Sequence, residues 1–202
     1  MPKDVERIMA ARAACSYGMP PDLKQRINDN KRTDIWGIYS IKSGIVVLVQ
    51  SEKNGNQSRN YGNSIIIQNT DETFVRYAHL ESVNIQEGYW VFEGQCIGKM
   101  EDTGNGIPTP NKHLHISVYT SWAYKDKNGF RSVNAIINPE IYIKSGTYPC
   151  NTMISSWYNQ EFIRKDGTKY THEGTDFSGL DINKIDGWQK GLKGKEIFDA
   201  QN

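Results

Sequence analysis

Short runs of β-branched and other apolar residues, separated by turn residues, follow one another from Asp34 to Val118. Such runs between Gly, Asn, Asp and Ser are typical of β-strands joined by tight turns. The expected strands are residues 38–41, 45–49, 64–68, 73–80, 83–85, 90–92, 96–98 and 112–118. This pattern predicts a mainly β protein built on an antiparallel sheet. A short helix is expected only at the N-terminus, over residues 3–14, where apolar residues recur at helical spacing.

The charge, the apolar runs and the cysteines of the chain limit which partners and sites the sequence predicts. Its 24 Lys and Arg against 23 Asp and Glu give a formal net charge of +1, which offers no electrostatic basis for binding nucleic acid. No apolar run is long enough to span a membrane. The charged N-terminus has no apolar signal segment behind it. The three cysteines, Cys15, Cys96 and Cys150, lie far apart, which predicts neither a cysteine zinc site nor a full disulfide framework.

The last of the expected strands contains a His-x-His pair, His113 and His115, around Leu114. Residues i and i+2 of a strand point to the same face, so both imidazoles are expected on one side of the sheet and Leu114 on the other. Imidazole is a common zinc ligand and the usual acid or base near neutral pH. One strand could therefore present a metal ligand and a proton-transfer group together.

The chain has only four histidines, and the other two are His79 and His172. His79 ends an expected strand, and His172 lies four residues before Asp176. Two imidazoles and one carboxylate around zinc, with the fourth position open, form a hydrolytic site. Two further histidines could then take and give protons. The alternative is that each of the four histidines only satisfies a local polar need.

Further segments stand in a fixed order around the His-x-His pair. They are residues 61–67, 76–80, 91–98, 103–104, 113–118 and 138–139. On these segments the chain resembles the lysostaphin-type, or LytM-like, zinc metallopeptidases, which cut peptidoglycan cross-bridges. The resemblance covers about residues 37–142. The remaining motif of that family, His-x-x-x-Asp, is matched by His172 and Asp176.

The resemblance implies a role for each of these residues. It makes His172, Asp176 and His115 the zinc ligands, and it makes His79 and His113 the catalytic histidines beside the metal. The implied fold is a mostly antiparallel β-sheet with a groove over the zinc. The implied partner is a peptidoglycan peptide stem or cross-bridge.

The order of the motifs departs from the family, in which His-x-x-x-Asp precedes His-x-His. The N-terminal region holds a faint copy of the late segment, which is the stretch of residues 148–202 that carries His172 and Asp176. In this copy Asn30 and Asp34 take the positions of His172 and Asp176. The amide of Asn30 is a poor replacement for an imidazole. The parallel stretches are 16–18 with 156–158, 33–37 with 175–179, and 38–43 with 197–202.

Two architectures follow from this order, on a division into residues 1–33, 34–147 and 148–202. In the first, the domain is circularly permuted, and residues 148–202 return to the sheet of residues 34–147 with His172 and Asp176. In the second, the front end is duplicated: residues 16–142 form a complete but metal-deficient domain, and residues 148–202 begin a second copy that the chain does not finish. We expect the first, because an unfinished half-domain would leave a strand edge unpaired. Exchange of the late segment within a homodimer is a third route to the same site.

The expected function is hydrolysis of peptide cross-links in bacterial peptidoglycan by a zinc metalloendopeptidase. The alternative is an inactive LytM-like module that binds the cell wall or a protein partner. Action on the wall requires a location outside the cytoplasmic membrane, in the periplasm, in the cell wall or on a phage particle.

Overall fold

The computed structural model describes residues 36–55, 60–83, 85–104, 112–120, 125–126, 129–130, 136–150 and 152–181. The helix expected at residues 3–14 lies outside these residues, as do Asn30 and Asp34 of the faint copy. Among the described residues, no helix is long and apolar enough to cross a membrane.

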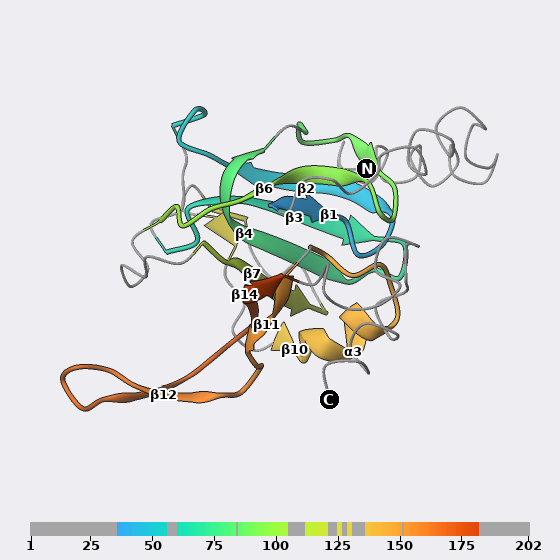
Figure 1. Cartoon of the computed structure of the whole chain (residues 1–202). Coiled ribbons are helices and arrows are strands. Elements are labelled where there is room, and N and C mark those ends of the chain that lie inside the picture. Colours follow the sequence, from blue (N-terminus) through green and yellow to red (C-terminus); the bar gives the residue numbers. More distant parts are fainter. Residues whose placement is uncertain are drawn as a thin grey trace.

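One ten-stranded sheet forms the body of the protein, in the order β11-β14-β7-β4-β3-β2-β5 (Figure 1). Outside this order, β6 pairs with β4 and β1, and β10 pairs with β7. All strand pairs are antiparallel, which confirms the predicted fold class. The strands are β1 (Gly37–Tyr39), β2 (Gly44–Gln50), β3 (Asn63–Asn69), β4 (Phe74–Val83), β5 (Trp90–Val91), β6 (Cys96–Met100), β7 (Leu114–Tyr119), β10 (Ile136–Ile137), β11 (Thr152–Ser156) and β14 (Thr175–Asp181).

Two short hairpins complete the described strands. β8 (Lys125–Asp126) pairs with β9 (Gly129–Phe130), and β12 (Glu161–Ile163) pairs with β13 (Lys169–Thr171). The β12–β13 hairpin extends away from the sheet as a long arm between β11 and β14 (Figure 1).

The two faces of β7 have different surroundings, as the alternation in its sequence predicts. Leu114, Ile116 and Val118 are fully buried in the main core, together with Phe177 from β14. On the opposite face, Tyr119 belongs to a smaller apolar cluster that also contains Leu48, Ile66 and Phe74. The polar residues of β7 lie on this second face.

The helix α3 (Pro139–Lys144) follows β10, in a part of the chain where the sequence analysis predicted no helix. Asn138 caps it, because its side chain accepts a hydrogen bond from the amide of Glu140. Pro139 occupies the first turn, where its missing N–H costs nothing. The helix packs against the sheet through the buried Tyr142 and Ile143.

Candidate metal centre

The sheet brings together residues that lie about sixty positions apart in the sequence. β14 pairs with β7, and Asp176 lies directly opposite His115. On the other side of β7, Ala78 of β4 is the partner of His115. His172 lies in the bend between β13 and β14. The strands β7 and β14, together with the bend before β14, therefore place two imidazoles and one carboxylate at a single position over the sheet.

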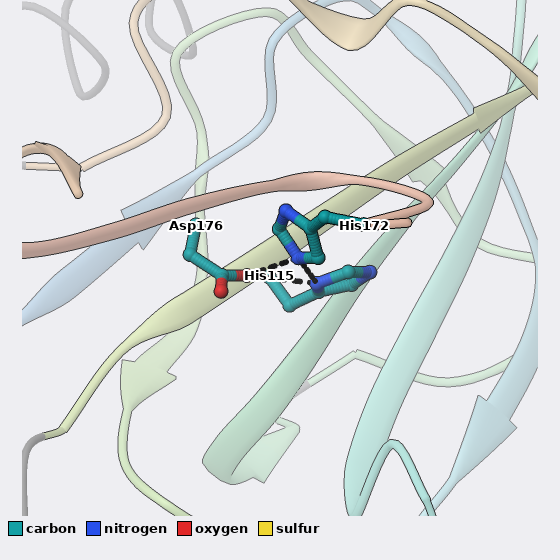
Figure 2. Close-up of side chains that lie close together, drawn as sticks. All are labelled: His115, His172 and Asp176. Carbon is teal, nitrogen blue, oxygen red and sulfur yellow. Dashed lines mark hydrogen bonds and ion pairs between the residues drawn. The ribbon is translucent and has the colours of Figure 1, made fainter. Parts of the chain in front are cut away.

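The three side chains point toward one another (Figure 2). Nδ1 of His115 lies 2.8 Å from Oδ1 of Asp176 and 3.3 Å from Nε2 of His172. Nε2 of His172 lies 3.3 Å from the same oxygen of Asp176. All three residues are buried or half-buried.

These separations fit a tetrahedral zinc ion. Zinc binds imidazole nitrogen and carboxylate oxygen at about 2.0–2.1 Å, so neighbouring donors of a tetrahedral site lie about 3.3–3.4 Å apart. Two of the three separations have this value, and the third is shorter because Nδ1 of His115 and Asp176 contact each other directly. Three protein donors leave a fourth position for a small molecule, as in catalytic zinc sites.

Hydrogen bonds fix the orientation of His172. Its Nδ1–H donates to the carbonyl oxygen of Trp157 at 3.1 Å, so Nε2 of the neutral ring presents a lone pair to the cluster. The backbone amide of His172 donates to Gln160, and its carbonyl accepts from Asn159. The ring of Phe162, from β12, packs edge-on against the imidazole at 5.9 Å between centroids.

Gly174 makes room for the ring of His115. A Cβ atom at position 174 would lie 2.4 Å from Cε1 and 2.5 Å from Nε2 of that imidazole. No side chain fits at this distance, so the segment between His172 and Asp176 approaches β7 only because glycine stands in its middle.

The charges of the cluster are coupled. Burial opposes ionisation of Asp176, but contact with the His115 and His172 imidazoles outweighs burial and holds the pKa of its carboxyl far below the usual range. Burial lowers the pKa of the His115 imidazole, with Asp176 acting in the opposite direction. Burial also disfavours the charged form of His172, but contact with Asp176 raises its pKa overall. The carboxylate is therefore ionised at neutral pH and is available as a donor.

His79 and His113 lie beside these three residues. The rings of His79 and His113 are 4.4 Å apart between centroids, and His79 is 6.0 Å from His115. Nδ1–H of His79 donates to the carbonyl oxygen of Thr103 at 2.8 Å, which leaves a lone pair on Nε2. Burial and the neighbouring His113 lower the pKa of His79 to about 4, so its ring is neutral at pH 7.

A buried cation lies on the same face of the sheet. Arg76 is the partner of Ser117 in the pairing of β4 with β7, and only 2% of its surface is exposed. Its guanidinium stacks 4.0 Å from the ring of Tyr61, which in turn lies 5.8 Å from His115. Its Nε and Nη2 atoms have no hydrogen-bond partner in the described part of the chain.

The structure thus brings together all five residues that the sequence singled out, while their assigned roles stay predictions. The sequence analysis missed three contacts at the site: the hydroxyl of Ser117, the space left by Gly174 and the carbonyl of Thr103. Ser117 could have been found, because it stands two residues after His115 on the same face of the strand. The other two depend on how distant segments meet.

The fold and these donors define a class: an antiparallel β-sheet protein with a candidate metal centre of two histidines and one aspartate. Residues 27–129, about half of the chain, match the profile of Peptidase family M23. The chain belongs to this family. The matched residues include His79, His113 and His115 but end before His172 and Asp176.

Curated relatives match part of the chain. The murein hydrolase activator NlpD of Escherichia coli is 35% identical over 104 residues, which are 49% of this chain and 24% of the relative. An uncharacterized lipoprotein of the same organism, YgeR, is 38% identical over 66 residues, 33% of this chain and 24% of the relative. The chain therefore spans about a quarter of the length of these relatives.

Solved structures also match. The catalytic domain of the antimicrobial peptidase lysostaphin from Staphylococcus simulans is 24% identical, covering 55% of this chain and 73% of that domain with a TM-score of 0.42. A zinc-containing peptidase from Vibrio cholerae is 29% identical, covering 43% of this chain and 24% of that protein with a TM-score of 0.36.

Proposed function

We propose that this protein is a zinc metalloendopeptidase that hydrolyses peptide cross-links of bacterial peptidoglycan. The observation that carries the proposal is the meeting of His115, His172 and Asp176 at separations close to those of a tetrahedral zinc site. Membership of Peptidase family M23, whose members use zinc and act on peptidoglycan, supports both the metal and the substrate class.

Each side chain of the site has a distinct task in this proposal. His115, His172 and Asp176 hold the zinc through Nδ1, Nε2 and a carboxylate oxygen. Zinc, when bound, supplies a Lewis acid that polarises a peptide carbonyl and lowers the pKa of water.

His79 and His113 act on the water and the substrate. Nε2 of His79 is neutral and carries a lone pair, so it can accept a proton from the attacking water. His113, with its ring against that of His79, stabilises the oxyanion that develops on the substrate carbonyl. Together the two imidazoles polarise the water and stabilise the charge that its attack creates.

The proposal includes the permuted architecture. Residues 148–202 return to the sheet of residues 34–147 and bring His172 and Asp176 to His115. The position of β14 between β11 and β7 in one sheet supports this arrangement. A segment-swapped homodimer would form the same contacts between two chains, and the mass of the protein in solution distinguishes the two.

Digestion of purified peptidoglycan sacculi tests the activity. Sacculi of known cross-link type are incubated with the zinc-loaded protein, and the products are identified by mass. We expect the protein to cleave the cross-links and the His79→Ala variant to leave them intact. The masses of the products also identify the bond that is cut. Intact sacculi of every cross-link type would refute the proposal. Action on this substrate requires a location in the periplasm, in the cell wall or on a phage particle.

A second function is a non-catalytic module that binds the cell wall or a protein partner. The observation that favours it is the 35% identity to NlpD, which is named an activator of murein hydrolases. Metal content separates the two functions. One zinc per chain, lost on His115→Ala, supports the enzyme, whereas a metal-free protein that still binds sacculi supports the module.

A further inference from the structure

The imidazole of His115 has a polar partner on each of its two nitrogens. Nδ1 faces Asp176 and His172, and Nε2 lies 2.8 Å from the hydroxyl oxygen of Ser117. His115 is 8% exposed and Ser117 is fully buried. The function proposed above assigns no role to this serine.

The tautomer of His115 decides whether it can hold a metal. A neutral imidazole carries one proton, and only the nitrogen without it offers a lone pair. Nδ1 is the nitrogen that points into the cluster with Asp176 and His172, so a metal there requires the proton on Nε2. That buried N–H must then donate to an acceptor, and the oxygen within reach is Oγ of Ser117.

A hydroxyl suits this position because it can either donate or accept. When Nδ1 is bare, Ser117 accepts from Nε2–H. When Nδ1 carries a proton and donates to Asp176, Nε2 accepts from the hydroxyl of Ser117. The contact therefore holds the ring in place whether or not a metal is present.

The backbone of Ser117 is itself fixed. β7 lies between β4 and β14, with Ser117 paired to Arg76 and the preceding Ile116 paired to Thr175 and Tyr77. The hydroxyl is therefore held beside the imidazole from a fixed backbone position.

We propose that Ser117 is the positioning residue of the metal centre: its hydroxyl anchors the ring of His115 and accepts the Nε2–H hydrogen bond that the metal-binding tautomer requires, and so presents Nδ1 to zinc. The inference rests on the zinc site of the proposed function but not on its catalytic activity. Groups that orient a metal-binding histidine in this way typically contribute about 10–100-fold in metal affinity.

Zinc affinity, measured by competition with a chromophoric chelator, is the first test. Ser117→Ala removes the acceptor and is expected to weaken zinc binding about 10–100-fold. Ser117→Thr keeps a hydroxyl and is expected to restore the affinity of the unaltered protein. Ser40→Ala is the matched control, because Ser40 is also fully buried and donates to a backbone carbonyl, but it lies outside the site. Its zinc affinity should not change.

Nitrogen NMR of labelled imidazoles is the second test. If Ser117 had only a structural role, its substitution would leave the tautomer of His115 unchanged. The zinc-loaded protein should show a protonated Nε2 and a metal-bound Nδ1 on His115, and Ser117→Ala should lose this signature or populate a second tautomer. If Ser117→Ala fails to fold, Ser117→Cys replaces the hydroxyl by a poor acceptor of similar size and should show the same loss of affinity.

The outcomes separate this inference from the proposed function. Unchanged zinc affinity and an unchanged His115 tautomer in a folded Ser117 variant would overturn the inference and leave the peptidase intact. A protein that binds zinc through the Ser117-dependent tautomer but leaves all sacculi uncut would overturn the peptidase and support the inference. An unaltered protein that binds no zinc would overturn both.

Discussion

At the scale of single residues, the site contains a strained histidine. His79 has a φ of 61°, in the left-handed region that non-glycine residues rarely occupy. The strain is maintained by its surroundings, because the amide of His79 donates to Tyr61, its carbonyl accepts from Glu101, and its ring donates to Thr103. Such strain persists where the structure around it is strong enough, commonly at functional sites.

Substitution of His79 separates a catalytic role from a metal-binding role. His79→Ala is expected to leave zinc bound, because three other donors hold it, and to lower the rate of hydrolysis by about 10²–10⁴-fold, the usual contribution of a general base. Zinc content and turnover of a cross-linked peptide are measured on the same sample, with His115→Ala as the variant that should lose both. Loss of zinc from His79→Ala would show that its role is misassigned.

Arg76 provides a prediction on stability. Its buried guanidinium is stacked on tyrosines but lacks hydrogen-bond partners for Nε and Nη2 in the described residues. A buried charge without a paired anion is costly, whereas an apolar side chain of similar length is not. Arg76→Met is therefore expected to leave the free energy of unfolding in urea unchanged or to raise it by about 1 kcal/mol. A clear loss of stability would mean that the stacking outweighs the desolvation of the charge.

At the scale of elements, most of the sheet follows from the short runs of β-branched and other apolar residues between turn residues. The predicted strands around 45–49, 64–68 and 112–118 correspond to β2, β3 and β7. The pairing of β7 with β14 could not be predicted by the same argument, because periodicity gives the face of a side chain but not the neighbour of a strand. The motif order raised the question of a permuted domain, and the position of β14 beside β7 supports the permuted architecture proposed above.

There are physical reasons why the sequence analysis missed some elements. α3 is six residues long, too short for helical periodicity to emerge, although Asn138 and Pro139 carried its start signal. The β12–β13 hairpin is mostly exposed, so it lacks a buried apolar face. It is held instead by local contacts, such as the stacked rings of Phe162 and Tyr170.

Asp71 connects α3 to the turn between β3 and β4. Its carboxylate accepts from Thr73, Lys42 and the hydroxyl of Tyr142. Burial would raise the pKa of Asp71, but the hydrogen bonds from Thr73 and Lys42 outweigh burial and lower it below the ordinary 3.8. A depressed folded pKa stabilises the protein above the unfolded pKa, and this contribution is lost as the pH falls through the folded value.

Asp71→Asn is therefore expected to lower the free energy of unfolding at pH 7, by about 1 kcal/mol or less because the carboxylate is partly exposed. It should also make the loss of stability below about pH 4 less steep. Asp166 is the matched control, since it makes the same bonds to Thr168 in the β12–β13 turn but reaches no helix. Equal effects of both substitutions would show that the link to α3 contributes nothing.

At the scale of the whole molecule, the late segment is part of the core as well as of the site. Tyr148, Cys150 and Phe177 are fully buried in the main apolar cluster. Removing everything after Thr147 would expose the side of β7 that β14 covers, along with the apolar residues beneath it. The part of the sheet that remains should consequently be less stable than in the full chain.

Truncation after Thr147 tests the permuted architecture. It removes two of the three proposed ligands, so zinc binding should become weak and hydrolysis should be lost, because zinc sites need three or four protein ligands. His172→Ala in the full chain reproduces the loss of a ligand without the loss of the core, and Asp34→Ala should matter little for metal. An essential Asp34 with a dispensable region after Thr147 would sink the permuted architecture.

The donors of the metal centre lie far apart along the chain, since His172 lies 57 positions and Asp176 lies 61 positions after His115. A zinc ion bound by all three would close loops of this length, much as a disulfide does, and a disulfide around a loop of this size is worth about 4 kcal/mol. Binding at 100 times the dissociation constant adds about 2.7 kcal/mol to the folded state. A chelator should therefore lower the melting temperature and accelerate proteolysis of the β11–β14 segment. Under the proposed function, the supply of zinc would then set the lifetime of the protein as well as its rate of hydrolysis.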